Sequence, residues 1–305
     1  MENGLDVFLL GAGASHGSLD CEPEIPPLAA DLYERLLRRP VFRELIPPNF
    51  VAVATNFEAT LSKLWDEHAD RMVPVLNEVA VYFSDFRPGA GNLYVELGRR
   101  IRQRADKTVL ASLNAEMLLE MSLFGSGVPC HYEGTFPAHG ARILKPHGSV
   151  NFLPTLAGTT EGSLLHACEL AGLENCNAIQ VVSDPGQIHR YIRTTGLPPM
   201  LAAFMPNKPI PFCRAVIKDF WTTWHSVVKA ARSLTIIGVD LGGAGPHIWD
   251  PLCALSGTID YVGPDPDAEA KLVTMAPRAS RIAIAGDSFE AYLKRTPPKK
   301  GYHLW

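Results

Sequence analysis

The fold of this 305-residue chain is indicated by one stretch near its start, Leu5-Asp-Val-Phe-Leu-Leu-Gly-Ala-Gly-Ala-Ser-His-Gly-Ser18. Residues 7 to 10 form a short, fully apolar run, which predicts a strand buried on both faces. The run breaks into Gly11-Ala12-Gly13, and a buried strand that enters a glycine-rich turn is typical of folds that bind dinucleotides. The match to G-x-G-x-x-G is incomplete, because His16 stands where the third glycine belongs. The stretch alone leaves two interpretations open, a nucleotide-binding loop and an ordinary turn after a strand.

Composition places the chain among globular proteins. Hydrophobic residues make up 47% of it and charged residues 20%, which leaves little room for long disorder. The formal net charge is −4 and no basic run occurs, so direct nucleic-acid binding has no electrostatic support. No apolar stretch reaches the roughly 18 residues that a membrane span requires. No basic residue precedes the first apolar run, so we expect no secretory signal and a cytoplasmic protein.

The cysteines are scattered along the chain, and no two of them have C-x-x-C spacing. This argues against a four-cysteine zinc ribbon, and we expect no metal site. In a chain without a secretory signal, such cysteines are typical of reduced thiols. The six are Cys21, Cys130, Cys168, Cys176, Cys213 and Cys253.

Apolar runs of strand length alternate with segments of helical periodicity along most of the chain. Strands are predicted over 7–10, 108–113, 143–144, 178–182, 234–238, 258–262 and 281–285. Helices are predicted over 28–39, 56–65, 71–104 with a break near 88–91, 215–231, 247–255, 268–275 and 288–293, with a further one starting at 117. The alternation predicts an α/β protein: a Rossmann-like, mostly parallel sheet with helices on both faces.

Domain organisation follows from a change in character in the middle of the chain. Residues 153–212 are rich in glycine, cysteine and proline, with one clear strand, and we interpret them as a small inserted subdomain or lid. The Rossmann-like core then comprises 1–152 and 213–295 of a single domain spanning 1–305.

Polar residues follow several of the predicted strands, at the sheet edge where open α/β sheets bind ligands. Asn114 follows the strand at 108–113, and a plain helix cap is the alternative interpretation of it. His147 stands on a Gly-Ser turn, where it suits a general base, and a surface loop histidine is the alternative. Asp240 follows Gly238 in a second glycine-rich turn, where an acid could bind a ribose. Glu58, in the first turn of a predicted helix, is explained by dipole compensation.

Taken in order, these motifs resemble the SIR2-like family. The resemblance rests on Gly11-Ala12-Gly13-Ala14-Ser15, Asn56-Phe57-Glu58, Asn114 with Leu118 and Glu120, His147-Gly148-Ser149-Val150-Asn151-Phe152, and Ile236-Ile237-Gly238. The resemblance spans nearly the whole chain, and within the family the chain most resembles the bacterial anti-phage defence NADases.

Three positions differ from the family pattern. Glu116 stands where the family has an aspartate, Pro146 where it has a leucine, and Asp265 follows Gly263-Pro264 where it has an asparagine. The zinc-ribbon cysteines of the deacetylases are absent.

The resemblance implies an NAD+ glycohydrolase that releases nicotinamide and ADP-ribose, with NAD+ as substrate and no metal. Asn114 and His147 are then the catalytic residues beside the nicotinamide ribose, and the bend from Gly11 to Ser15 holds the pyrophosphate. The nucleotide-contacting residues predicted in this way are Gly11, Ala12, Gly13, Ser15, Asn114, Gly238, Asp240 and Asp265.

Two other functions stay open beside this one. A protein deacylase would use an acylated lysine as the nucleophile at the same centre. A non-hydrolytic module would sense NAD+ or ADP-ribose within a larger assembly, and Glu116 and Pro146 favour it. Since a free NADase is toxic, family analogy predicts a gated effector that forms homo-oligomers and responds to a separate partner protein, with an ATPase as one candidate.

Overall fold

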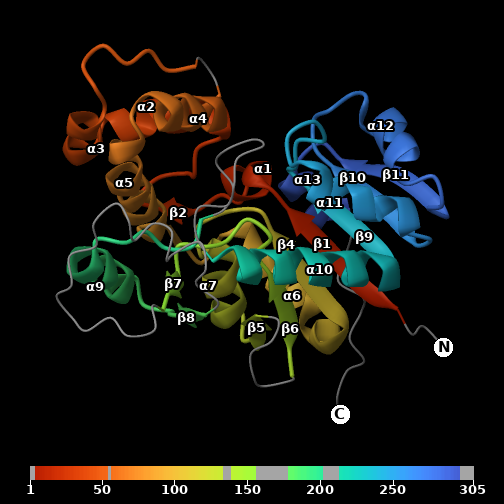
Figure 1. Ribbon diagram of the computed structural model, residues 1–305. Coiled ribbons are helices and arrows are strands. Elements are labelled where there is room, and N and C mark those ends of the chain that lie inside the picture. The colour runs from red at the N-terminus through yellow and green to blue at the C-terminus, as the bar shows by residue number, and fades with distance from the viewer. Residues whose placement is uncertain (1–3, 54–55, 133–138, 156–177, 202–212, 296–305) are drawn as a thin grey trace.

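The computed structural model describes residues 4–53, 56–132, 139–155, 178–201 and 213–295, which Figure 1 draws as coloured ribbons. Their centre is a seven-stranded sheet of order β11-β10-β9-β1-β4-β6-β5, in which every neighbouring pair is parallel. The strands are β1 (Leu5–Leu10), β4 (Thr108–Ser112), β5 (Cys130–Tyr132), β6 (Ala141–Leu144), β9 (Ala231–Ile237), β10 (Thr258–Val262) and β11 (Arg281–Gly286). The predicted α/β fold with a parallel sheet is confirmed.

Helices cover both faces of this sheet, and the alternation of side chains along β1 shows how. Phe8 and Leu10 belong to one buried apolar cluster, and Val7 and Leu9 belong to a second cluster on the other face. Each fully buried side chain of this size contributes roughly 1.5–3 kcal/mol to folding. Such burial on both faces explains why residues 7 to 10 carry no polar side chain.

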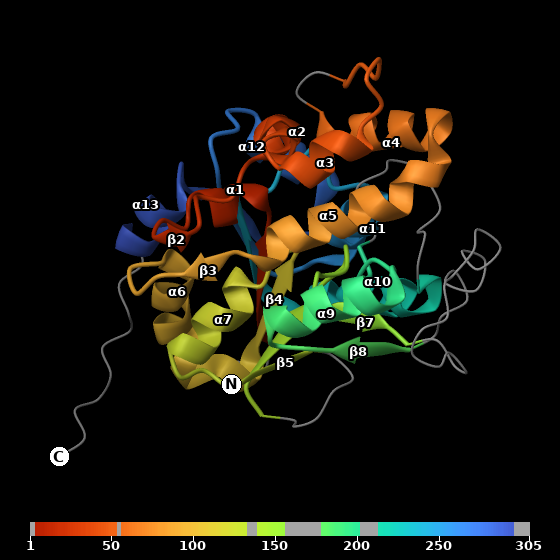
Figure 2. The same ribbon diagram turned by 90° about the vertical axis from the view of Figure 1, so that its left-hand side faces the viewer.

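The first cluster is covered by α2 (Ala29–Leu37), α3 (Pro40–Leu45), α4 (Phe57–Glu67), α5 (Met72–Ser84), α6 (Leu93–Ile101), α7 (Leu118–Gly125), α9 (Pro185–Thr195) and α13 (Phe289–Arg295). The second is covered by α10 (Arg214–Ala230), α11 (Pro246–Trp249), α12 (Ala268–Met275) and the 3-10 helix η4 (Asp250–Ala254). Figure 2 brings α5, α7 and α9 in front of the sheet. Shorter elements are α1 (Ala12–His16), η1 (Ala69–Arg71), η2 (Arg102–Lys107), and the antiparallel pair β2 (Cys21–Glu22) and β3 (Arg87–Pro88).

The strand order changes direction beside β1, and this fixes where a ligand can bind. The chain continues from β1 to β4 on one side, whereas it continues from β9 to β10 on the other side. The connections that leave β1 and β9 therefore lead to opposite sides of this point, and such switch points at the carboxyl ends of the strands are where open α/β sheets bind ligands.

The described part of 153–212 packs against the core. Strand β7 (Phe152–Pro154) pairs antiparallel with β8 (Ile179–Val181), which confirms the predicted strand at 178–182. Ile188 of α9 and Leu197 are buried in the first apolar cluster. Residues 156–177 and 202–212 of the predicted insert, and the tail at 297–305, lie outside the described residues. The interpretation of 153–212 as a subdomain or lid stays a prediction.

The predicted helices are found close to their expected bounds. Asn56 caps α4, since its Oδ1 accepts a hydrogen bond from the Ala59 amide at 2.8 Å. The long helical stretch at 71–104 is divided into α5 and α6 around residues 88–91, as its Pro-Gly sequence predicts. Among the described residues, no helix is both long and apolar enough to cross a membrane.

Candidate active site

Two glycine-rich bends meet at the carboxyl ends of β1 and β9. The Gly11 amide donates to the Ile237 carbonyl at 3.0 Å, and the Gly13 amide donates to the Gly238 carbonyl at 2.9 Å. Gly238 has a φ of +61°, and a Cβ atom there would lie 2.2 Å from the Ala14 nitrogen. Glycine is required because the two backbones touch. The close approach puts the predicted loop at the point where the strand order reverses.

Asn114 reaches this first bend from the end of β4. Its Nδ2 donates to the Gly11 carbonyl at 2.9 Å and to the Ser15 hydroxyl at 2.8 Å. The alternative interpretation of Asn114 as a helix cap is wrong, because α7 begins after Met117. Residues about 100 positions apart in the sequence are thus in contact, and Asn114 keeps part of its surface exposed.

Ser15 lies at the centre of a buried polar cluster. Its hydroxyl donates to Glu116 Oε1 at 2.5 Å, and the Tyr94 hydroxyl lies 2.9 Å from it. With Asn114 as a further donor, all hydrogen-bonding positions of the Ser15 oxygen are used inside the protein. Ser15 is only 2% exposed. In this arrangement its side chain positions Asn114, and the exposed part of the bend is the backbone around Ala12.

The Glu116 side chain links two neighbouring parts of the site. Its Oε2 accepts from the Leu118 amide at 2.7 Å, so the carboxylate joins the start of α7 to Ser15. Burial raises the pKa of Glu116, and the nearby Lys145 ammonium and the Ser15 hydrogen bond oppose this shift. The carboxyl group therefore serves to fix Asn114 and Ser15 in place.

Lys145 is a fully buried lysine that the sequence analysis did not single out. Its Nζ donates to the backbone carbonyls of Asn114, at 3.0 Å, and Glu116, at 2.8 Å, and it lies 3.1 Å from Glu120 Oε1. The ammonium thereby ties the turn after β4 to the end of β6. No motif marks it, since its only signal is its place directly before Pro146 and His147.

The turn that carries His147 is shaped by Gly148. Gly148 has a φ of +77°, and a Cβ atom on it would lie 2.0 Å from the Met200 carbonyl oxygen. The Ser149 hydroxyl and the Val150 amide both bond the Ala115 carbonyl, which attaches this turn to the one after β4. Asn151 donates to the Val182 carbonyl at 3.0 Å. Much of the motif around His147 is therefore explained by packing.

The His147 ring points to a partner that the sequence analysis missed. Its Nε2 lies 2.9 Å from Nε2 of His247, and Trp221 of α10 packs against the His247 ring with centroids 4.4 Å apart. Burial, together with His247, lowers the pKa of His147 to about 3. Burial also lowers the pKa of His247 to about 4, although Asp250 opposes this. Both rings are therefore neutral at pH 7.

The other predicted nucleotide contacts lie at the ends of β9 and β10. Asp240 Oδ1 accepts from the Gly242 amide at 2.9 Å, and Asp265 Oδ2 lies 2.8 Å from Lys271 Nζ. Burial and the Asp240 carboxylate raise the pKa of Glu58 to about 7. The Asp240 carboxylate thus influences Glu58, an effect that the expectation of dipole compensation did not include.

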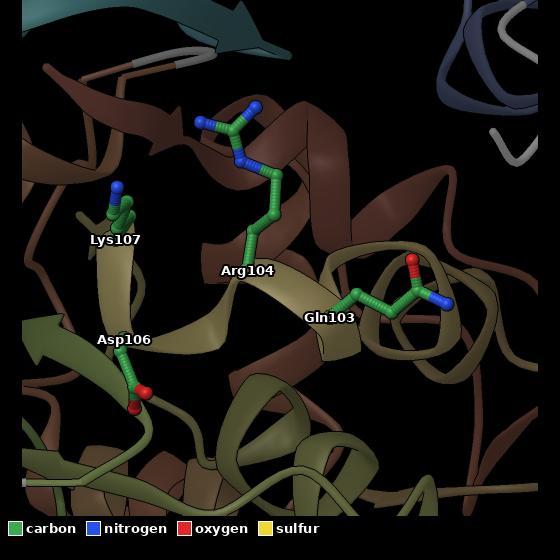
Figure 3. A pocket seen from close by; sticks show the side chains of 4 residues that line it. All are labelled: Gln103, Arg104, Asp106 and Lys107. Carbon is green, nitrogen blue, oxygen red and sulfur yellow. The ribbon is translucent and has the colours of Figure 1, made fainter. Parts of the chain in front are cut away.

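A surface hollow of about 420 Å³ lies at the opposite edge of the sheet (Figure 3). It is lined by Gln103, Arg104, Asp106 and Lys107, which directly precede β4. Figure 3 shows the Asp106 side chain pointing away from those of Arg104 and Lys107. Arg104 Nε also lies 3.2 Å from Asp6 Oδ2. We place the candidate site at the carboxyl edge instead, because the polar side chains converge there.

Within the described ranges, no group of three or more His, Cys, Asp or Glu side chains could hold a metal ion. No family model and no curated protein matches the sequence.

Solved structures similar to this chain include several Sir2 proteins. A Sir2 protein bound to a propionylated peptide is 14% identical over 96% of this chain and 92% of that chain, with a TM-score of 0.47. A mutant Sir2 homologue in complex with ADP-ribose is 16% identical over 96% and 90%, with a TM-score of 0.47. A Sir2 homologue in complex with NAD is 14% identical over 96% and 88%, with a TM-score of 0.46. At these identities, the likeness concerns the arrangement of the chain alone.

Proposed function

We propose that the chain is an NAD+ glycohydrolase, which converts NAD+ and water to nicotinamide and ADP-ribose. One observation carries the proposal: the side chain of Asn114 is fixed against the Gly11–Ser15 bend at the point where the strand order reverses. A polar amide held at the carboxyl edge of a parallel sheet, beside a glycine-rich bend, suits a dinucleotide. The SIR2-like order of motifs supports NAD+ as that dinucleotide.

The reaction needs no general acid, because the leaving group does not have to be protonated. The bond between C1′ of the ribose and the pyridinium nitrogen breaks, and its electron pair leaves with nicotinamide, which departs neutral. The water oxygen forms the new bond to C1′, and its proton passes to an imidazole and on to solvent. Asn114 can orient the ribose hydroxyls or the water through its amide, and His147 is the base.

The wider role rests on the family resemblance. We propose a gated effector of bacterial anti-phage defence that depletes cellular NAD+, works as a homo-oligomer and is activated by a separate protein, an ATPase being one candidate. A gated enzyme is consistent with the site, because the Nδ2 atom of Asn114, the Ser15 hydroxyl and the Nε2 atom of His147 are engaged with one another or with neighbouring residues.

The test follows nicotinamide release from NAD+ by the purified chain, alone and with its neighbouring gene product, with and without an acylated peptide. We expect release that needs no peptide. The substitution Asn114→Ala should lower turnover at least about 100-fold, the usual scale for a positioned polar group in catalysis. His147→Ala should lower it similarly.

The matched control is Asn77→Ala on α5, whose amide bonds the Gly196 carbonyl at 2.9 Å and not the bend. It should leave turnover near the wild-type rate. Release that depends on the peptide would instead assign a deacylase. A second candidate, a non-hydrolytic sensor of NAD+ or ADP-ribose, is favoured by the occupied state of the Ser15 and His147 groups. It predicts nucleotide binding without nicotinamide release under any trigger.

A further inference from the structure

Three aromatic side chains from three segments meet beside the candidate site. The Nε2 atoms of His147 and His247 are 2.9 Å apart, with the rings tilted at 50°. Trp221 stacks on the His247 ring at an interplanar angle of 31°, and its Nε1 donates to the Pro146 carbonyl at 2.9 Å. Trp221 therefore holds both ends of the contact, the His247 ring and the residue before His147.

The direction of the hydrogen bond between the two histidines depends on the tautomer of each ring, and the surroundings of His147 favour one direction. A hydrogen bond with the Ala244 backbone raises the pKa of the His147 ring and so favours its protonated form. A backbone group with that effect is a carbonyl oxygen, since an amide N–H would favour the unprotonated ring. Because Nε2 faces His247, the carbonyl takes the Nδ1 hydrogen of His147. The Nε2 atom of His147 then carries the lone pair, and His247 donates to it.

We propose that His247 is an autoinhibitory latch, which occupies the one basic lone pair of His147 and must withdraw before that ring can take a proton from a ribose hydroxyl or a water. The latch comprises His247, the Nε2–Nε2 hydrogen bond and Trp221. The proposal rests on the proposed function and adds to it the residue that keeps the site inactive. It also explains how one chain can hold an assembled site and remain gated.

The topology places the latch across the site. His147 follows β6 and His247 follows β9, and the two strands are separated in the sheet by β1 and β4. The glycine bend and Asn114 follow those two intervening strands. The contact between the histidines therefore bridges elements on either side of the predicted nucleotide site.

The segment that carries His247 is rich in glycine. Gly242, Gly243 and Gly245 precede it, and Gly245 has a φ of +84° directly before α11. Gly242 and Gly243 are exposed, and the carboxylate of Asp240 at the start of the segment influences Glu58. Glycines at these positions let the backbone change direction at low cost. A ligand held near Asp240 can therefore act on His247 through a short, flexible connection.

Electrostatics agree with an inhibitory role. The titratable groups that face the pair are His225 on α10 and Asp250 on η4, and each acts on His247. Burial and His247 hold the pKa of His147 near 3, far below the neutral range in which a general base works best. Removing His247 opens the ring to solvent and removes the neighbouring ring, and both changes raise the pKa of His147.

The first experiment measures nicotinamide release by the full chain carrying His247→Ala or His247→Phe. The phenylalanine keeps a ring against Trp221 but has no N–H to donate, so it guards against a folding defect in the alanine variant. We expect both variants to release nicotinamide about five-fold faster than the wild type without a trigger, the factor that corresponds to one net hydrogen bond. The control His225→Ala removes a neighbouring imidazole outside the contact, and its rate should stay unchanged. A lower rate in both His247 variants would overturn the latch and make His247 a residue that assists His147.

The second experiment does not depend on activity. Nitrogen-15 NMR of the histidine rings follows the titration of His147 in the wild type and in His247→Phe. We expect the pKa of His147 to rise by at least one unit in the variant, and an unchanged titration would overturn the latch. If the titration shifts while no form of the protein releases nicotinamide, the contact stands and the proposed hydrolase fails. If the wild type hydrolyses NAD+ and the titration does not shift, the hydrolase stands and the latch fails.

Discussion

Glu58 shows how the surroundings of a single residue can outweigh its place in a helix. It lies in the first turn of α4, where a carboxylate is stabilised by the helix dipole, by typically 0.3–1 kcal/mol. Burial and the carboxylate of Asp240 nevertheless raise its pKa to about 7. Desolvation and like-charge repulsion therefore exceed the dipole term, and the ionised form of Glu58 destabilises the folded protein.

The substitution Glu58→Gln should stabilise the protein at alkaline pH. The pKa of Glu58 is higher in the folded state than in the unfolded state, so the folded state loses stability as pH rises from about 4.5 to about 7. Glutamine removes this loss, and we expect a melting temperature a few degrees above that of the wild type at pH 8. The difference should vanish near pH 4.

Thermal unfolding followed by circular dichroism at both pH values measures this effect. The control is Glu44→Gln, which changes an exposed glutamate on α3. An equal gain in both variants would mean that net charge, and not the surroundings of Glu58, is responsible.

Single residues also show which parts of the candidate site could be predicted from the sequence. Asn114 and His147 could be predicted, because buried strands are legible as apolar runs and a polar residue after such a run lies at the sheet edge. Their partners could not. Lys145 and His247 come from segments whose contacts depend on tertiary packing, and neither belongs to a recognisable spacing. The buried cluster around Ser15 likewise depends on side-chain directions that local sequence does not specify.

Among the structural elements, the turn after β6 shows how backbone geometry determines which residue can be accommodated. Gly148 combines a φ of +77° with the closest approach to the Met200 carbonyl. Gly196, which ends α9, has a similar φ of +72°, but a Cβ atom there would meet nothing within 4 Å. Both glycines thus have a positive φ, but only Gly148 also lacks room for a Cβ atom.

This difference can be measured by replacing each glycine with alanine. Gly196→Ala should lower the free energy of unfolding by about 1 kcal/mol, the cost of a left-handed conformation for a residue with a side chain. Gly148→Ala should cost at least about 2–3 kcal/mol, because the Met200 segment must also move. Urea denaturation gives both values, and equal losses would show that the approach to Met200 relaxes freely.

Most of the long elements were predicted, but the 11-residue helix α9 and the short strand β5 were not. Strands β1, β4, β9, β10 and β11 are five to seven residues long and largely apolar, and all were predicted. Strand β5 was missed, since its three residues include His131 and it forms only at the edge of the sheet through β6. Such a strand depends on its neighbour more than on its own sequence.

At the scale of the whole molecule, the parallel sheet brings groups far apart in the chain to one edge, and their protonation then affects global stability. His147 and His247 have pKa values of about 3 and 4 in the folded protein, against about 6.5 in an unfolded chain. Between those limits the unfolded chain binds more protons. The contribution of the pair is therefore fully present above pH 6.5 and is lost as pH falls towards 4.

The free energy of unfolding should accordingly fall between pH 7.5 and pH 5, by at most about 2 kcal/mol for each of these two rings. In His247→Phe the residue at 247 no longer titrates, and the pKa of His147 is lowered less than in the wild type. The fall in the free energy of unfolding should therefore be less than half that of the wild type. His225→Ala, which leaves the contact intact and removes only the smallest influence on the pKa of His247, should show nearly the wild-type fall. Urea titrations at the two pH values measure the difference. A fall in His247→Phe as large as that in the wild type would mean that the acid sensitivity arises elsewhere in the fold. The closed state of the candidate site would then have to be maintained without the histidine pair.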